Sequence, residues 1–358
     1  MEPAVRTQLL ETVETQRFGC EMSGSDLYSD VLLAVAADVR ADGPIAGLLE
    51  PVALAPFGDA VILRFLAALH LLVLDSRAPT LAAHYPSVGG SPGRGLAEAV
   101  VATAADHRAE IAGKLVLGVQ TNEVGRSAAL LGGYLELARL GLPLRVLEVG
   151  ASAGLNLLFD HYRYVDHSGA TFGPADSALV FDRPWFFGVP ELDLPLVVAE
   201  RRGSDVAPIA IDTPEGRLRL RSFVWGDQPD RLRRLDAALE VAAARPPVVD
   251  RASAPDWLRE QLASPRPGCT TVVGHSIMFQ YLSDDGRQEM LAAIDAAGRA
   301  ATPEAPFAWL RLEPGGDQAE LRLTAWPGGT THLLAKSSYH GPPVVWLAPE
   351  GGVLRPLR

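Results

Sequence analysis

The residues best suited to chemistry lie in the stretch 146–155, which reads Val-Leu-Glu-Val-Gly-Ala-Ser-Ala-Gly-Leu. An apolar run ends with Glu148 and Val149, breaks into Gly150-x-Ser152-x-Gly154, and then resumes with helical spacing. This pattern predicts a strand, a tight turn and a helix start, an arrangement that presents backbone N–H groups to a ligand. Two chemistries fit it. Either the Ser152 hydroxyl is a nucleophile, or the loop cradles a nucleotide-type cofactor.

The nucleophile interpretation makes the protein a serine hydrolase. Gly-x-Ser-x-Gly is similar to the nucleophile turn of some lipases and esterases. Downstream acids could complete a catalytic triad with one of the histidines His275, His332 or His340. In those enzymes, however, the turn follows several strands and an oxyanion loop of His-Gly-Gly type lies upstream. The upstream region here is helical in pattern and has no such loop, so the cofactor interpretation is favoured.

The same stretch resembles the first motif of class I S-adenosylmethionine-dependent methyltransferases. The resemblance implies cofactor-binding roles for Glu148, Gly150, Ala151, Ser152 and Gly154. Gly150 then permits the tight turn, and Gly154 lets helix and strand pack closely. Ser152 stands where the family often has glycine. The resemblance also implies S-adenosylmethionine as cofactor and methyl transfer to an oxygen or nitrogen of a small molecule.

Acids at the ends of later strands are expected to hold the rest of such a cofactor. Asp205 follows a predicted strand at 196–198 and is the candidate for the ribose hydroxyls. Asp166 is closer in sequence but lacks a convincing strand before it. Asp250, after a short strand at 247–249, is the candidate for the adenine side. Choosing Asp205 implies an insertion near residues 165–195, rich in aromatic residues and proline, which is either a substrate lid or a packed surface excursion.

His275 ends another predicted strand, at 270–273. A neutral imidazole there could accept a proton from an attacking oxygen or nitrogen, so His275 is the candidate catalytic base. The alternative is a structural histidine that is hydrogen-bonded to a neighbouring group.

Polar residues gather on both sides of the glycine loop. Before it, the candidates for pocket lining are Gln120, Asn122, Glu123 and Arg126. If they are buried they need partners, and the alternative is that Asn122 and Glu123 simply cap a helix. After the loop, Asn156, Asp160 and Tyr164 are spaced to share one face of a helix and contact substrate. If that face points to solvent instead, Asp160 only balances Arg163.

Several longer motifs together look like a bacterial family of unknown function, which is thought to share the methyltransferase-like fold. They are Gln-Thr-Asn-Glu-Val-Gly-Arg at 120–126, Glu-Val-Gly-Ala-Ser-Ala-Gly-Leu-Asn-Leu at 148–157, Asp-x-Tyr-Arg-Tyr at 160–164 and Val-Trp-Gly-Asp-Gln at 224–228. The resemblance covers nearly the whole chain. Two positions depart from it. His161 replaces an expected arginine, and Asp250-Arg-Ala replaces an expected Gly-Asp-Ala.

Composition narrows the class of protein. The chain of 358 residues is 48% hydrophobic and 21% charged, with a formal net charge of −11. This balance suits a globular protein and makes nucleic acid an unlikely partner. Two cysteines, Cys20 and Cys269, exclude a disulfide framework and a cysteine-rich metal site. The longest apolar stretch, 61–74, carries Arg64 and His70 and is too short to span a bilayer. We therefore expect a cytoplasmic protein without a membrane or metal site, whose partner is a small-molecule substrate.

The surrounding elements must position these residues. Helical patterns at 5–17, 26–40, 59–75, 96–115 and 123–140 predict an all-helical region at 1–140. Runs at 144–149, 196–198, 218–224, 247–249, 270–273 and 307–312 alternate with helical patterns and predict parallel strands at 141–358. Runs at 320–325 and 332–336 predict an antiparallel hairpin around 326–329, and 344–347 an edge strand. The predicted fold is α/β, with a Rossmann-like methyltransferase core after an all-helical amino-terminal region.

Overall fold

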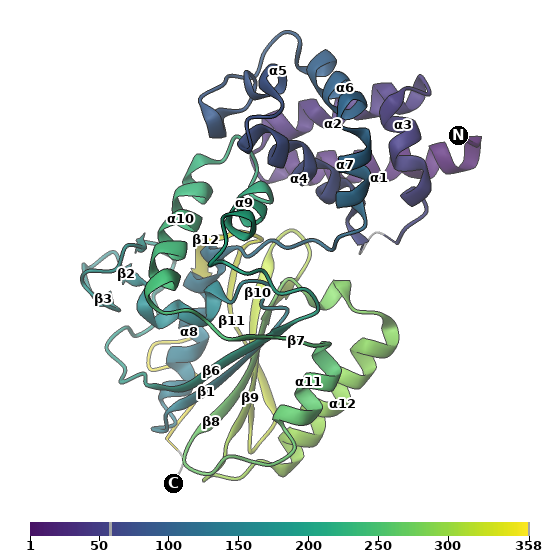
Figure 1. Cartoon of the computed structure of the whole chain (residues 1–358). Coiled ribbons are helices and arrows are strands. Elements are labelled where there is room, and N and C mark those ends of the chain that lie inside the picture. Colours follow the sequence, from purple (N-terminus) through teal and green to yellow (C-terminus); the bar gives the residue numbers. More distant parts are fainter. Residues whose placement is uncertain (57–58, 357–358) are drawn as a thin grey trace. The chain divides into compact units, whose positions relative to one another are not determined.

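The computed structural model describes residues 1–56 and 59–356, and Figure 1 shows its helices and strands. The chain forms two compact units, each described here by itself. The helical unit comprises Met1–Thr121 and Asp212–Arg233, and the sheet unit comprises Asn122–Ile211 and Arg234–Arg358. Each unit is thus made of two separate segments of the chain, which differs from the single boundary predicted at residue 140.

The helical unit has its own apolar core. Its elements are α1 (Pro3–Met22), α2 (Asp26–Arg40), α3 (Pro44–Leu49), η1 (Glu50–Val52), α4 (Val61–Leu74), α5 (Pro79–Ala82), η3 (Pro86–Val88), α6 (Leu96–Asp106), α7 (Arg108–Leu115) and α9 (Pro214–Ser222). The predicted cap of α2 is confirmed, because the Ser25 side chain accepts a hydrogen bond from the Tyr28 N–H. The predicted helix 96–115 is two helices that meet at His107. No helix among the described residues is both long and apolar enough to cross a bilayer.

The predicted strand at 218–224 is wrong, because residues 218–222 belong to α9 and the helix ends there. Alternating arginine and leucine at 217–221 mimics the period of a strand. Stronger helix signals flank it, namely the Thr213 cap, Pro214 in the first turn and basic residues in the last turn.

The segment after α9 holds residues 212–233 to the rest of the helical unit. The Ser25 hydroxyl donates to Asp227 Oδ1 over 2.7 Å, and the Leu27 N–H donates to Asp227 Oδ2 over 3.1 Å. The ring of Trp225 stacks on that of Tyr28 with centroids 5.8 Å apart. The Val-Trp-Gly-Asp-Gln motif therefore has a structural role in this unit.

The sheet unit is built on a nine-stranded sheet with the order β5-β12-β11-β10-β9-β8-β1-β6-β7. Its strands are β1 (Leu144–Val149), β5 (Trp185–Phe186), β6 (Val198–Asp205), β7 (Val249–Arg251), β8 (Thr270–Ser276), β9 (Phe307–Pro314), β10 (Ala319–Trp326), β11 (Thr330–Ser338) and β12 (Gly341–Trp346). Five of them, β7, β6, β1, β8 and β9, are neighbours in this order and pair in parallel. The α/β class with a mostly parallel sheet is confirmed.

Strand β1 lies at the centre of the parallel part and is buried along its whole length. The chain runs from β1 to β6 on one side and later returns to β8 on the other. The carboxyl ends of β1 and β8 therefore form the switch point of the sheet, where open α/β sheets bind ligands. The glycine loop leaves β1 at this point.

Helices cover both faces of the sheet (Figure 1). On one face lies α8 (Ser127–Ala138), which packs on β9 to β12. Gly132 and Gly133 let it approach closely, since a Cβ at either position would lie 2.3 Å from Trp346 or Leu310. On the other face, α11 (Ala254–Gln261) and α12 (Asp284–Ala300) bury Leu147 and Val273. Because α8 packs on the sheet, the sheet unit begins well before residue 140.

The carboxyl-terminal part is an antiparallel meander from β9 to β12. It contains the predicted hairpin, but β12 is not the edge strand. The edge is β5, which pairs with β12 in parallel and comes from the predicted insertion. The indole N–H of Trp185 in β5 donates to the Ala128 carbonyl of α8. The insertion also forms a small sheet of β2 (Arg163–Val165), β3 (Thr171–Phe172) and β4 (Val180–Asp182). The insertion therefore adds a strand to the large sheet and packs as a surface excursion, which is one of the two predicted alternatives.

Candidate functional site

The glycine loop after β1 is a tight turn with three residues at positive φ. These are Gly150 at +67°, Ser152 at +54° and Gly154 at +76°. The Gly154 N–H donates to the Ala151 carbonyl over 2.7 Å and closes the turn. A positive φ at Ser152 is uncommon for a residue with a side chain, so the turn is strained at this position. The predicted helix after the loop is a seven-residue 3₁₀ helix, η5 (Leu155–His161).

Close packing explains why glycine occupies three positions at this edge. A Cβ on Gly150 would lie 2.9 Å from the Met278 Cβ, and one on Gly154 would lie 2.8 Å from Pro247 and Val249. A Cβ on Gly203 of β6 would lie 2.7 Å from the Ala151 Cβ. Such distances are far below normal contact. The loop is therefore wedged between β6, the chain entering β7 and the segment after β8.

Asp205, the last residue of β6, holds the loop from the side. Its Oδ2 accepts a hydrogen bond from the Ser152 N–H over 2.9 Å, and its Oδ1 accepts one from the Ala207 N–H over 2.8 Å. The Ser152 carbonyl in turn accepts from the Ile209 N–H. Sequence analysis expected Asp205 at the end of the second parallel strand, as a candidate for the ribose hydroxyls, and Asp205 is the last residue of β6. In this structure its carboxylate contacts the backbone of the loop itself.

Glu148 is the buried carboxyl at the base of the loop. Its side chain is within the protein core, and Oε2 is shielded from solvent with no hydrogen-bond partner among the described residues. Burial raises the pKa of Glu148 to about 8, Arg126 opposes this increase, and Asp205 adds to it. The carboxyl is therefore largely protonated at neutral pH.

Arg126 provides positive charge near Glu148. It ends the 3₁₀ helix η4 (Val124–Arg126) and is buried. Its Nε donates to the Tyr339 carbonyl over 3.0 Å and its Nη1 to the Ser276 carbonyl over 3.1 Å. These bonds fix the guanidinium between the end of β8 and the end of β11, at the switch point.

Asn122, Glu123 and Asn156 form hydrogen bonds on either side of the loop. Asn122 Oδ1 accepts from the Leu155 N–H over 3.0 Å. Asn156 Oδ1 accepts from the Ser127 hydroxyl over 2.7 Å, and its Nδ2 donates to the Glu123 carbonyl. The Glu123 side chain caps η4 through the Gly125 N–H. These bonds join the start of α8 to the exit of the loop.

His275 has partners at both ring nitrogens. The Trp309 indole N–H donates to Nε2 over 2.9 Å, so Nδ1 carries the proton and donates to Glu313 Oε1 over 2.7 Å. The same Glu313 oxygen accepts from the N–H groups of Met278 and Phe279. Register places Glu148 beside Gly274, so His275 faces the opposite side of the sheet. The structure does not bring His275 and Glu148 together, and His275 offers no nitrogen to a substrate.

Asp250, Asp160 and Tyr164 are committed to other contacts. Asp250 makes two hydrogen bonds to Arg202 and one to the Trp257 indole, and the Arg202 guanidinium holds the pKa of this carboxyl below its usual value. Asp160 pairs with Arg201 over 2.8 Å. The alternative that Asp160 only balances Arg163 is therefore wrong.

Tyr164 lies in β2, not on a helix, and its hydroxyl donates to the Phe159 carbonyl. The predicted helical face that would join Asp160 to Tyr164 is therefore wrong.

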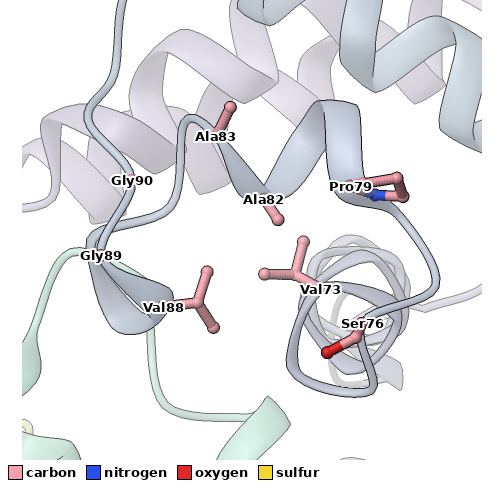
Figure 2. A pocket seen from close by; sticks show the side chains of 8 residues that line it. All are labelled: Val73, Ser76, Pro79, Ala82, Ala83, Val88, Gly89 and Gly90. Atoms are coloured by element: carbon pink, nitrogen blue, oxygen red, sulfur yellow. The ribbon is translucent and has the colours of Figure 1, made fainter.

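Gln120 belongs to the helical unit and is buried. That unit also has an open hollow of about 410 Å³, lined by eight residues that Figure 2 shows. They are Val73, Ser76, Pro79, Ala82, Ala83, Val88, Gly89 and Gly90. The Ser76 hydroxyl is the single polar side chain of this lining, so the hollow offers little chemistry.

Sequence analysis missed four residues of the site, namely Gly203, Ser204, Met278 and Glu313. A glycine inside a strand, such as Gly203, indicates close approach of another backbone, so the sequence itself carries a signal for this residue. The Ser204 hydroxyl, like that of Ser152, is buried with no hydrogen-bond partner in the described chain. No local pattern marks Met278 or Glu313, because their contacts depend on strand order.

Fold and site together define an α/β protein with a glycine-loop site at the switch point of a mostly parallel sheet. The family model described as "Uncharacterized protein conserved in bacteria (DUF2332)" matches residues 11–346, and the chain belongs to this family. Neither the curated proteins nor the solved structures include a significant match to the chain.

Proposed function

We propose that the sheet unit binds S-adenosylmethionine at the glycine loop and transfers its methyl group to an oxygen or nitrogen of a small molecule. One observation carries the proposal. The loop leaves the central strand β1 at the switch point of five parallel strands, above a buried carboxyl. An Asp at the end of the neighbouring strand β6 is bonded to the loop. Open α/β sheets bind nucleoside-type ligands at this place, which supports the proposal.

Two buried oxygens near the loop favour a polar ligand. Glu148 Oε2 and Ser152 Oγ are shielded from solvent and have no hydrogen-bond partners among the described residues. The Ser204 hydroxyl is shielded in the same way, but Ser204 pairs with Val149 and so faces the side of the sheet opposite to Glu148. Buried polar atoms without partners are rare and call for an explanation. A ligand with hydroxyl, carboxylate and ammonium groups would supply the missing partners. Asp250 does not fit an adenine-binding role, because Arg202 and Trp257 already occupy its carboxylate.

In this proposal the residues bind and orient. The turn 150–154 and Glu148 hold the methionine end, and Asp205 keeps the turn in place beside the ribose. Bound S-adenosylmethionine would supply a methyl group on a positively charged sulfur; the acceptor oxygen or nitrogen would take the methyl group, S-adenosylhomocysteine would leave, and the acceptor proton would pass to solvent. That reaction depends chiefly on alignment and exclusion of water. It requires no covalent residue, and His275 serves the structure through Glu313 and Trp309.

Calorimetry with S-adenosylmethionine, S-adenosylhomocysteine and NAD tests the proposal directly. We expect wild type to bind both sulfur ligands with micromolar to submillimolar Kd and not to bind NAD. Asp205→Ala should weaken binding at least tenfold. The matched control is Asp295→Asn, which changes an exposed carboxyl of α12. This variant should bind the sulfur ligands as wild type does. No binding of either sulfur ligand at millimolar concentration would contradict the proposal.

Turnover separates an enzyme from a binding protein. Formation of S-adenosylhomocysteine with a panel of small hydroxyl and amine acceptors supports methyl transfer. Binding without turnover across the panel supports a non-catalytic, nucleoside-sensing protein.

The hydrolase remains a second candidate, because Ser152 has the positive φ expected of a nucleophile turn. Its hydroxyl, however, has no base within hydrogen-bond distance. Covalent labelling of Ser152 by a fluorophosphonate would restore that candidate.

A further inference from the structure

Two arginines lie directly opposite each other on the sheet unit, on the side of the sheet away from Glu148. Arg311 of β9 pairs with Arg322 of β10 in the antiparallel register, and Arg311 lies beside His275 in the register of β8 and β9. Because His275 faces the side opposite to Glu148, both arginines lie outside the glycine-loop site. Directly opposite side chains on antiparallel strands have Cβ atoms within about 5.5 Å, and like charges at this separation are destabilising. An anion bound beside the two guanidinium groups would offset this repulsion.

The carboxyl groups near this pair are committed to other partners. Glu320 accepts hydrogen bonds from Nε and Nη2 of Arg322 over 2.9 and 2.6 Å, and it lies 3.6 Å from the Lys336 ammonium. Glu313 accepts from a histidine ring and from two backbone N–H groups. Arg311 itself forms no ion pair with a carboxylate among the described residues. The protein therefore leaves the charge of this guanidinium unpaired.

Arg311 is partly buried and its guanidinium has a defined position. The guanidinium carbon lies over the Trp309 ring, 3.8 Å from the ring centroid. Nη1 donates to Thr324 Oγ1 over 3.0 Å, and Thr324 Oγ1 lies 2.8 Å from Thr331 Oγ1. Within residues 1–56 and 59–356, this is the one hydrogen bond of the guanidinium. Its remaining N–H groups are therefore held in place and available to bind two oxygens of one oxyanion side by side.

Burial and the charge of Arg322 lower the pKa of Arg311 to about 10, although Glu313 opposes this change. The guanidinium is still charged at neutral pH, and partial burial of a cation without an acid partner accounts for the direction. We propose that Arg311 and Arg322 form a second ligand site, which binds the carboxylate or phosphate group of a small molecule. The oxyanion accepts from the unused N–H groups of Arg311 and offsets the repulsion between the two arginines. The bonds of Arg322 to Glu320 stay in place.

This site uses no residue of the glycine loop, so its test is independent of the proposed function. The experiment is an NMR titration of the full chain labelled with ¹⁵N, in which each arginine Nε–H gives its own signal. Arg311→Lys and Arg322→Lys assign the two signals by their loss. Inorganic phosphate and acetate are added separately, with sodium chloride at equal ionic strength as the reference. We expect phosphate, acetate or both to shift the two signals saturably with a Kd of about 1–10 mM. Sodium chloride should give no saturable shift.

Arg311→Met keeps an apolar chain over the Trp309 ring and removes the charge, so the saturable shift of the Arg322 signal should be lost. The matched control is Arg299→Met, which changes an exposed arginine of α12 and should leave the Kd within about twofold of wild type. The proposal is overturned if neither oxyanion gives a saturable shift in wild type up to about 100 mM. A wild-type Kd at Arg322 in Arg311→Met overturns it as well. The wild-type titration decides the question even if Arg311→Met does not fold.

Discussion

The carboxylate of Asp205 accepts a hydrogen bond from the Ser152 N–H over 2.9 Å, although the two residues are 53 positions apart in the chain. This bond joins the end of β6 to the turn that follows β1. A second bond, from the Ala207 N–H, holds the other oxygen of the carboxylate. The shape of the loop therefore depends on a side chain of the neighbouring strand as well as on its own glycines.

Asp205→Asn should lower the free energy of unfolding by about 2 kcal/mol, because an amide offers one acceptor oxygen where the carboxylate offers two. Urea denaturation followed by circular dichroism measures this change. Asp295→Asn, the exposed control, should change it by less than about 0.5 kcal/mol. A loss below that limit for Asp205→Asn would show that the loop does not depend on this bond.

Ser152→Gly should stabilise the protein by about 1 kcal/mol. Glycine adopts the positive φ without strain, and the change also removes a buried hydroxyl without a partner. Ser152→Ala keeps the backbone strain and should gain less. The comparison uses midpoints of denaturant unfolding, and a destabilised glycine variant would contradict the strain seen at this turn.

Gly150→Ala should destabilise the protein by about 2–3 kcal/mol, since it adds a Cβ at positive φ and 2.9 Å from the Met278 Cβ. Met278→Gly removes the atom in the way. In a double-mutant cycle the pair should show a coupling of about 1 kcal/mol. Additive effects would mean that backbone strain alone accounts for the loss.

Glu313→Ala should loosen the segment after β8, because it removes the acceptor of the His275 ring and of the Met278 and Phe279 N–H groups. Hydrogen exchange at those two amides should accelerate by about 10–100-fold, as expected when about 1.4–3 kcal/mol of protection is lost. Glu313→Gln keeps one acceptor oxygen and should show a smaller effect. If hydrogen exchange at these two amides is unchanged in Glu313→Ala, side-chain packing and not Glu313 keeps this segment in place.

Stability should depend on pH through Glu148. Its pKa increases on folding, from 4.5 to about 8. Its contribution to stability is therefore fully present below pH 4.5 and is lost as the pH rises through about 8, by at most about 5 kcal/mol. Glu148→Gln removes this loss. Unfolding free energies of the two proteins from pH 5 to 8.5 should diverge with increasing pH, and parallel curves would contradict the burial of this carboxyl.

The sequence by itself determined what depends on neighbouring residues. It located β1 and its turn, because an apolar run before Gly150 and Gly154 has few other outcomes. It also found the Ser25 cap of α2, and placed Asp205 at the end of its strand. Where a local pattern misled, as in the arginine and leucine alternation of α9, end signals favoured the helix.

Only the tertiary structure decided which distant residues meet. It placed Trp309 and Glu313 on the two nitrogens of His275, and paired Asp250 with Arg202. It also assigned residues 212–233 to the helical unit and left Glu148 buried beside Asp205. The physical reason is the same in each case. Strand order and packing set these contacts, and with them the burial and charge of each site. The hydrophobic period of a sequence indicates only which face of a single helix or strand is buried.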